Sequence, residues 1–527
     1  MARTSHAPYL SVVVTARNDN HGGNMLARMR AMLDSWVSQA EQFGIESEIL
    51  VVEWNPPEDR PRLREIFGQS FRSEICEVRF VEVPHHLHAL FGNSTAIPLH
   101  QMIAKNVGIR RARGEYVLAT NIDIVCSSDL MKFFGQRSLT PRTLYRMDRH
   151  DISSNLPESA TTTELLHFCE THLLRVFARE GDFRLSSDGT RMLDDEDIVT
   201  SASGVRFGKG WFSVESSLGE RYRWLESEAE LIVDQTGSGV QNLVISAEIG
   251  PSAGSDQVRL DITDESDWLI ATGEVRGRCL LNVDLARANS PRHLFLRTYG
   301  KGLPLSSHPR IVNLRIFAIK AGAAGQTARL AEETRPGKIE MIQTGPAFDW
   351  NSSFSSASPH AHEMKTSAYL HTNAAGDFTL LSRDDWFALR GYAELPIWPM
   401  HIDLLLCYAA HHSGIRESIL HEPMRAYHVE HSSGAGWTPE GEALRAKRIK
   451  AKAIRELRYE YAAHLVDLMR KYNAPVTFNR SNWGLADYDS LEAASSANLS
   501  GPSPGEHGLN PSPAVQELDV SQFDQRE

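Results

Sequence analysis

The sequence has few cysteines, and their arrangement excludes a disulfide-stabilised scaffold. Only five occur in 527 residues, without a CxxC pair or a regular framework. Single, scattered cysteines fit a reducing compartment better than an oxidising one. We therefore expect buried thiols at all five positions, which are Cys76, Cys126, Cys169, Cys279 and Cys407.

Long apolar runs are also lacking. No run reaches the ~18 apolar residues that a membrane-spanning helix needs. The opening residues, MARTSHAPYLSVVV, lack the long apolar segment and small-residue cleavage site of a signal peptide. We expect a cytoplasmic protein, with the inner face of the membrane as a second expected location.

An excess of basic residues is missing too. The chain has 55 Lys and Arg against 67 Asp and Glu, which gives a formal net charge of −12. Affinity for a phosphate backbone comes from clustered Lys and Arg, so this balance argues against nucleic acid as a partner.

What the sequence does contain is an α/β pattern at its start. An apolar, β-branched run at 9–15 predicts a buried parallel strand, and residues 25–43 have the spacing of a helix. Further strands are expected at 49–53 and 78–83. Because a strand, helix, strand order implies a right-handed crossover, we expect an open parallel sheet with ligand loops at the carboxyl ends of its strands.

Residues 104–129, AKNVGIRRARGEYVLATNIDIVCSSD, are the most informative stretch. A helix is expected at 99–113 and a fourth strand at 115–124, whose end carries Asn121 and Asp123. Carboxylates at the carboxyl edge of a sheet lie where α/β proteins bind ligands, and a hard divalent ion there would bind a diphosphate. The alternative is a polar strand end without function. Residues 1–150 form one α/β unit in this interpretation.

The pattern changes between 206 and 320 to short alternating runs punctuated by Gly, Pro, Asp and Ser, which predicts an all-β sandwich. Its aromatic residues, Trp211, Tyr222, Trp224 and Trp268, fit either core packing or stacking on a sugar. We expect 151–205 to connect the two units and 321–367, rich in Ala, Gly, Ser and Pro, to be a linker or mobile loop.

The α/β pattern resumes at 368–475, with a strand at 376–382, a helix at 401–411 and a long basic amphipathic helix at 440–472. The sandwich is therefore expected to interrupt the α/β domain. Residues 476–527 form a tail, which we expect to be disordered from about 492 because its composition buries little apolar surface.

Together these pieces resemble the GT-A class of nucleotide-sugar glycosyltransferases, in particular the large bacterial family 2 that builds surface polysaccharides. The resemblance covers roughly residues 8–150 and 368–440. It implies a GT-A fold, a nucleotide-diphosphate sugar as donor, a divalent cation (Mg or Mn), and a glycan or lipid-linked glycan as acceptor. Residues matched to the nucleotide-binding positions are Thr15, Ala16, Arg17, Asn18, Glu53, Asn106, Asn121, Ile122 and Asp123.

The sequence departs from the family at two of these places. Glu53-Trp54-Asn55 stands where the family has Asp-Asp-Gly or Asp-Gly-Ser, and Asn121-Ile122-Asp123 matches Asp-x-Asp with an amide in place of the first carboxylate. The resemblance assigns the metal to Asp123. Loss of one charge weakens the hold on the ion unless a later residue compensates.

Residues 427–431, Tyr-His-Val-Glu-His, offer that compensation, since many GT-A enzymes bring a late histidine to the same cation. His428 is the first candidate and His431 the second, with Glu430 as a carboxylate that orients either ring. The alternative is a surface histidine cluster that binds a loop.

On the acceptor side, Arg390-Gly391-Tyr392-Ala393-Glu394 resembles the family's turn into the catalytic helix, which usually begins Glu-Asp-x-Asp. Here the register gives Met400-His401-Ile402-Asp403. The base that takes a proton from the acceptor hydroxyl is then His401 or Asp403, with Glu394 third. A base opposite the leaving diphosphate implies inversion of configuration.

Two further clusters receive other interpretations. The histidines of 84–88 have no zinc spacing, and a loop near the acceptor entrance is expected. The basic residues of 445–452 form a solvated face or a peripheral membrane contact.

We expect a metal-assisted glycosyltransferase of polysaccharide or glycoconjugate synthesis. The alternatives are a catalytically eroded glycan-binding protein and a sugar-nucleotide nucleotidyltransferase.

Overall fold

The computed structural model describes residues 7–491 apart from internal gaps. The longest gaps are 190–204, 234–241, 286–292, 301–309, 323–338, 346–369 and 432–446. The tail that we expected to be disordered lies outside the described residues. The described residues form four sheets, a seven-stranded one and three smaller ones.

The main sheet has seven strands in the order β22-β6-β21-β4-β1-β2-β3. Strand β1 pairs in parallel with β2 and β4, and β2 pairs in parallel with β3. Only β21 runs antiparallel to its neighbours, β4 and β6, while β22 is parallel to β6. The expected mostly parallel α/β sheet is confirmed. Its strands are β1 (Leu10–Ala16), β2 (Ser47–Trp54), β3 (Cys76–Val83), β4 (Tyr116–Ala119), β6 (Thr143–Met147), β21 (Thr379–Ser382) and β22 (Arg416–Leu420).

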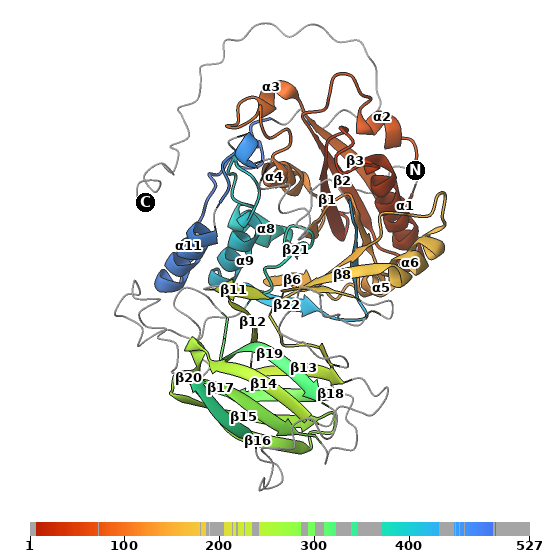
Figure 1. Ribbon diagram of the computed structural model, residues 1–527. Helices are drawn as coiled ribbons and strands as arrows, with labels where there is room; N and C mark the ends of the chain where they lie inside the picture. The colour runs from red at the N-terminus through yellow and green to blue at the C-terminus, as the bar shows by residue number, and fades with distance from the viewer. Residues whose placement is uncertain are drawn as a thin grey trace, which may run out of the picture. The chain divides into compact units, whose positions relative to one another are not determined.

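Helices cover both faces of this sheet (Figure 1). Val12 and Val14 share a core with helix α1 (Met25–Phe43), whereas Val13 shares one with residues of helix α4 (Gln101–Arg111). Successive side chains of a strand point to opposite faces, so both faces of β1 must be apolar, as its sequence LSVVVTA requires. Helix α4 approaches closely at Gly108, where an added Cβ would lie 2.4 Å from Cγ1 of Val13.

A second sheet has the order β5-β23-β7-β8-β9. Its strands are β5 (Ile124–Cys126), β7 (Arg149–Ile152), β8 (Leu173–Ala178), β9 (Gly181–Arg184) and β23 (Ala426–Val429). The strand that we expected at 115–124 is therefore wrong as one element, because the chain leaves the main sheet after Ala119 and turns into β5. The segment 151–205, expected only as a connection, supplies β8, β9 and helix α6.

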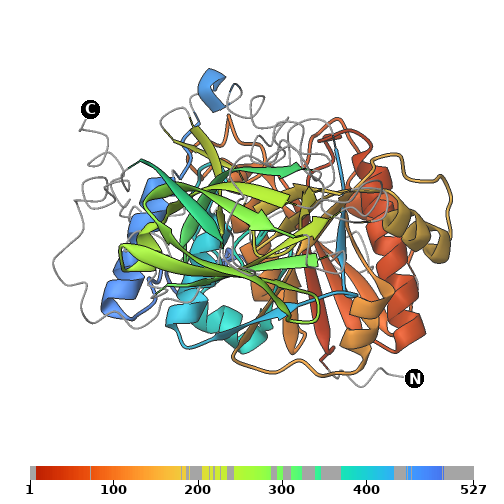
Figure 2. The ribbon, with the colours of Figure 1, turned by 60° about the horizontal axis from the view of Figure 1, so that its bottom comes forward.

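The β-rich region is all antiparallel and is inserted in the sequence between the two segments that form the α/β sheet, as expected; Figure 2 draws its strands mainly in green. Apolar residues from both of its sheets belong to one core cluster. One sheet contains β10 (Val205–Phe207), β13 (Glu228–Val233), β18 (His293–Tyr299), β15 (Gln257–Asp264) and β16 (Leu269–Arg276). The other contains β11 (Glu215–Ser217), β12 (Glu220–Leu225), β19 (Leu314–Gly322), β14 (Asn242–Ile249), β17 (Arg278–Asp284) and β20 (Glu340–Gly345).

One expectation for this region needs correction, and burial distinguishes the two interpretations of its aromatic residues. Strand β20 lies within 321–367 and pairs with β17, so part of the expected linker belongs to a sheet. Trp211, Tyr222 and Trp224 are buried, which supports core packing for these three, while Trp268 is 69% exposed.

Further helices in the described part of the chain are mostly short. They are α2 (Leu63–Phe67), α3 (His85–His88), α5 (Ser128–Gly135), α6 (Thr162–Thr171), α8 (Arg383–Leu389), α9 (Ile402–His412), α11 (Tyr459–Tyr472) and a 3-10 turn at Pro251–Ala253. The continuous helix expected at 440–472 is wrong: residues 454–457 are not helical, and Trp398 N donates to the carbonyl of Arg455 at 2.9 Å. Residues 432–446 lie outside the described part.

The cysteines are buried and unpaired, as expected. Burial raises the pKa of each thiol, for Cys76, Cys126 and Cys407 to about 12. Among the described residues, no helix is long and apolar enough to cross a membrane.

Candidate functional site

The strand order of the main sheet defines where a ligand site is expected. Strands β2 and β3 lie on one side of β1, and β4 lies on the other, so the order reverses between β1 and β4. In open α/β sheets, ligands bind beyond the carboxyl ends of the strands at such a reversal. The loops that leave these two strands are 17–24 and 120–123.

The 120–123 turn is fixed by hydrogen bonds from both ends. Thr120 N donates to the carbonyl of Val13 at 3.0 Å, and Thr120 Oγ1 donates to the carbonyl of Asp377 at 2.6 Å. Val429 N donates to the carbonyl of Asp123 at 3.0 Å, where β5 begins beside β23. This turn therefore carries Asp123 from the main sheet to the second sheet in a defined conformation.

Asp123 lies at the centre of a group of basic side chains. His431 Nε2 lies 3.3 Å and His428 Nε2 3.9 Å from its Oδ2 atom, and Arg28 of α1 donates to the same oxygen. Burial acts to raise the pKa of Asp123, but the hydrogen bond with His431 and the charges of His428 and Arg28 outweigh it and hold that pKa well below its ordinary value. Asp123 is therefore ionised throughout the physiological range.

His428 is held by a second carboxylate on its other side. The register of β23 places His428 between Ile124 of β5 and Asp151 of β7. Its Nδ1 atom lies 3.0 Å from Oδ1 of Asp151, which leaves Nε2 facing Asp123. Burial lowers the pKa of His428, as does Arg149, but the two carboxylates outweigh both effects and raise it. Glu430, the expected orienting residue, is not the carboxylate that contacts this ring.

The donor set of Asp123, His428 and His431 suits a divalent metal. Their candidate ligand atoms lie within 4.8 Å of one another, so small side-chain movements would bring all three to the ~2.0–2.2 Å that transition-metal bonds to His and carboxylate require. Two nitrogen donors and one oxygen donor fit Mn better than Mg, which takes oxygen ligands. Three protein ligands leave coordination positions for a substrate.

Asp151 belongs to a buried chain of contacts that returns to the 120–123 turn. Arg149 Nε lies 2.9 Å from Oδ1 of Asp151, and Arg149 Nη1 donates to Oδ2 of Asp377 at 2.6 Å. The other oxygen of Asp377 accepts from Asn121 Nδ2. Asn121 Oδ1 in turn accepts from Gln101 of α4 at 3.0 Å. The chain thus ties the histidine side of the site to the strand end that carries Asn121.

Lys105 lies beside this chain, and the sequence analysis did not single it out as a site residue. The side chain is fully buried on α4, and its Nζ atom donates to the carbonyl of Gly376. Burial lowers the pKa of Lys105 to about 8. The negative charges of Asp377, Asp403 and Asp123 act to raise this pKa, but burial has the larger effect. The only sequence signal was its place in the helix before the metal motif.

Asp403 and His401 lie at the start of α9. Asp403 Oδ2 accepts from Gly376 N at 2.7 Å, so both polar groups of Gly376 are bound, one by Asp403 and one by Lys105. Burial raises the pKa of Asp403, the direction that makes a carboxylate a stronger base. His401 precedes the helix with a left-handed backbone (φ 62°), and its charge acts on Asp403.

Glu394 and Asn106 contact each other. Glu394 Oε1 accepts from Asn106 Nδ2 at 3.0 Å and from Gly484 N at 2.8 Å. Asn106 Nδ2 also donates to the carbonyl of Tyr392, and Asn106 Oδ1 accepts from the backbone N–H of Tyr392, each at 2.8 Å. All of these groups hold backbone segments together, which is a structural role for both residues.

The loop after β1 contacts the loop after β2. Arg17 Nε donates to the carbonyl of Asn55 at 2.8 Å, and Asn18 Nδ2 donates to that of Pro61 at 2.9 Å. Glu53 Oε2 accepts from Leu63 N at 2.8 Å, and burial raises the pKa of Glu53 to about 7. The structure therefore brings together the loops expected to contact a nucleotide, although Glu53 itself is buried beneath them.

Three other residues matched to nucleotide-binding positions are also buried. Ala16 and Ile122 belong to the main core, so only their backbone groups are open to a ligand role. Thr15 is buried at the end of β1, and its Oγ1 has no hydrogen-bond partner among the described residues.

The histidines of α3 contact neighbouring side chains: His88 Nδ1 accepts from Trp54 at 2.9 Å, and His85 Nδ1 lies 3.0 Å from Oδ1 of Asn55.

Comparison with protein-family models finds no match to this chain, and neither does comparison with curated proteins.

Proposed function

We propose that the protein is a metal-dependent glycosyltransferase that moves a sugar from a nucleotide-diphosphate sugar to a hydroxyl of a glycan or lipid-linked glycan. The observation that carries this proposal is the convergence of Asp123, His428 and His431 at the strand-order reversal of an α/β sheet. A site there with an ionised carboxylate and two imidazoles suits a cation that also binds a diphosphate. The GT-A fold and the use of the β-rich region as a glycan-binding sandwich belong to the same proposal.

The residues around the site have distinct roles in this proposal. Asp123 and the two histidines would hold Mn or Mg, and a bound cation would supply Lewis-acid stabilisation of the leaving diphosphate. Asp151 orients His428, and the Arg17–Asn18 loop, which contacts the loop after β2, would bind the nucleotide. Polysaccharide or glycoconjugate synthesis in the cytoplasm, with contact to the inner membrane surface, is the setting that we propose.

The base in this proposal is His401 or Asp403, with Glu394 third, and two observations support Asp403. Its pKa is raised by burial, and its position is fixed by Gly376 N. Glu394 comes third because both of its hydrogen bonds, from Asn106 Nδ2 and Gly484 N, hold backbone segments together, although burial raises its pKa too. A carboxylate base on the acceptor side supports single displacement with inversion of the anomeric centre.

The test is a panel of nucleotide sugars incubated with the protein, Mn²⁺ and glycan acceptors, with release of free nucleotide as the readout. We expect nucleotide release with at least one donor. This release should stop when Mn²⁺ is chelated, and it should be absent in Asp123→Ala. An eroded glycan-binding protein would release none with any donor. A nucleotidyltransferase would instead form nucleotide sugar from nucleoside triphosphate and sugar phosphate.

A further inference from the structure

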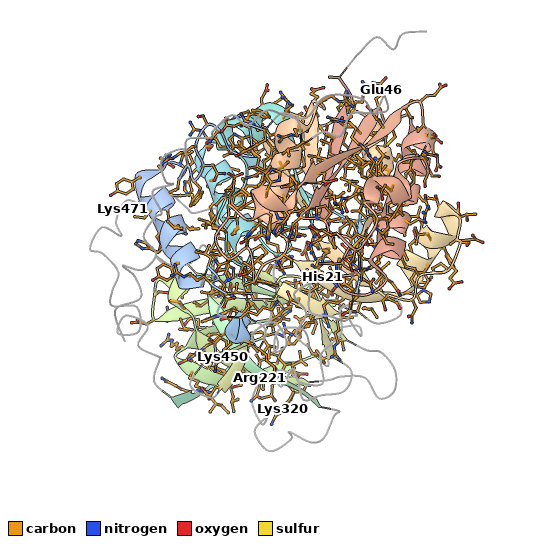
Figure 3. The ribbon with its side chains drawn as sticks, turned by 90° about the horizontal axis from the view of Figure 1, so that it is seen from above. His21, Glu46, Arg221, Lys320, Lys450 and Lys471 are labelled. Atoms are coloured by element: carbon orange, nitrogen blue, oxygen red, sulfur yellow. The ribbon has the colours of Figure 1, made fainter. Side chains whose placement is uncertain are left out.

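Arg28 contacts a metal-ligand candidate although it is permanently charged. It lies in the first turn of α1 and is only 3% exposed. Its Nη1 atom donates to Oδ2 of Asp123, its Nη2 atom donates to the carbonyl of His21 at 2.6 Å, and its Nε atom donates to the carbonyl of Gly23 at 3.3 Å. One guanidinium therefore joins Asp123 to the loop between β1 and α1, on which Figure 3 labels His21.

The oxygen that Arg28 contacts is the one that both histidines face. His431 Nε2 and His428 Nε2 lie 3.3 and 3.9 Å from Oδ2 of Asp123. A guanidinium does not lose its proton in proteins, so Arg28 places a fixed positive charge at the oxygen that a divalent cation would use. Two cations at one buried carboxylate oxygen repel each other strongly, because the surroundings screen charge poorly.

We propose that Arg28 exchanges partners during ligand binding: it neutralises Asp123 in the cation-free site, leaves Oδ2 when a divalent cation binds, and then binds the diphosphate of the donor. This inference rests on the proposed function. A guanidinium released from Asp123 can bind a cation-bound diphosphate, because its planar fork matches phosphate oxygens.

The loop between β1 and α1 must respond to this exchange. Asn20, Gly22, Gly23 and Asn24 all have positive φ angles, and a Cβ on Gly22 would lie 2.7 Å from Nη2 of Arg28. The loop is therefore wrapped closely around the guanidinium, and its carbonyls accept two of the three hydrogen bonds that the side chain makes to described residues. Movement of Arg28 away from Asp123 must loosen these contacts.

The first experiment measures Mn²⁺ affinity by titration calorimetry without nucleotide. Arg28→Met removes the competing charge and keeps most of the side-chain volume, so we expect Mn²⁺ to bind about tenfold more tightly than to the wild type. Arg28→Lys is the matched control, since it keeps the charge, and we expect affinity close to that of the wild type. Unchanged or weaker Mn²⁺ binding by Arg28→Met would overturn the proposal.

The second experiment measures binding of inorganic pyrophosphate at saturating Mn²⁺. Arg28→Met should bind pyrophosphate about tenfold more weakly than the wild type, with Arg28→Lys between the two, because a lysine cannot make the bidentate contact. Equal pyrophosphate affinity in Arg28→Met and the wild type would contradict the proposal that Arg28 binds the diphosphate after it leaves Asp123.

A third measurement uses only the wild type, so it stands even if the variants do not fold. Hydrogen exchange of the backbone amides of residues 20–24 should become faster when Mn²⁺ is added, since Arg28 then releases its contacts with the loop. Unchanged or slower exchange overturns the proposal. None of the three readouts uses sugar transfer. A result that contradicts the partner exchange of Arg28 is therefore separate from a negative result in the nucleotide-sugar panel.

Discussion

The Nδ1 atom of His428 lies 3.0 Å from Oδ1 of Asp151, a residue 277 positions earlier in the chain. Both side chains are buried, and they are direct neighbours in the pairing of β23 with β7. A carboxylate behind a histidine fixes which ring nitrogen is available to a metal and raises its basicity. Asp151 is therefore expected to act on the metal site through His428.

We predict that Asp151→Ala weakens Mn²⁺ binding about 10–100-fold, the usual cost of losing such a partner. Asp151→Asn should lose less, because its amide oxygen still accepts from Nδ1–H. Calorimetric titration of Asp151→Ala, His428→Ala and the double variant measures the coupling. Additive losses in the double variant would show that Asp151 does not act through His428.

Gly22 and Gly23 form a matched pair for a second prediction. Both have φ near +75°, but a Cβ at Gly22 would lie 2.6 Å from Nδ1 of His431, whereas a Cβ at Gly23 meets nothing within 4 Å. Each alanine variant should lose about 1–2 kcal/mol of unfolding free energy from backbone strain. Only Gly22→Ala should also weaken Mn²⁺ binding, about tenfold or more.

Denaturant unfolding and Mn²⁺ titration of these two variants separate backbone strain from the clash of the added Cβ, which would meet His431 and, at 2.7 Å, Nη2 of Arg28. If Gly23→Ala lost as much Mn²⁺ affinity as Gly22→Ala, strain in the loop would explain both effects, and the contact with His431 would have no special role.

A third prediction concerns Glu53 and pH. Burial raises the pKa of Glu53 from 4.5 to about 7 in the folded protein. The folded state then binds the proton more tightly than the unfolded state, so this contribution to stability is complete below pH 4.5 and is lost as pH rises through about 7. The contribution is at most about 3 kcal/mol.

Urea unfolding at intervals between pH 4.5 and 7.5 measures this dependence. Glu53→Gln should show a shallower loss of stability over that range than the wild type, because glutamine does not titrate and still accepts from Leu63 N. Parallel curves for the two proteins would contradict the shifted pKa.

The fourth prediction distinguishes two roles for Glu394. Because its carboxylate bonds Asn106 and Gly484 N, Glu394→Ala leaves buried donors without acceptors and should lower the free energy of unfolding by about 1–3 kcal/mol. Mn²⁺ affinity of the folded variant should stay near that of the wild type. A stable variant with normal Mn²⁺ binding and no sugar transfer would instead identify Glu394 as a catalytic group.

The sequence was most informative where local pattern and burial agree. The apolar run of β1 and the helical spacing of α1 predicted both elements, and α1 has the expected bounds of Met25–Phe43. The expected strand at 115–124 failed because residue alternation does not reveal a change of sheet. The break after Ala119 depends on Thr120 bonding Asp377, a contact between segments 257 residues apart.

Some residues of the candidate site were likewise indicated by the sequence, and others were not. Resemblance to a known motif pointed to Asp123, His428 and His431, which the structure brings together, although metal binding by them stays a prediction. Asp151 and Arg28 lie in an ordinary strand and helix, without a motif that marks them. Their contacts follow from strand register and helix packing, which no local pattern in one sequence contains.

The most direct test of the account is a titration of the wild type and Asp123→Ala with Mn²⁺, followed by the Mn²⁺ signal in electron paramagnetic resonance. We predict one bound ion per wild-type chain, with nitrogen couplings from two imidazoles, and no such ion in Asp123→Ala. Mn²⁺ bound to Asp123→Ala with the same affinity and the same nitrogen couplings would contradict the account.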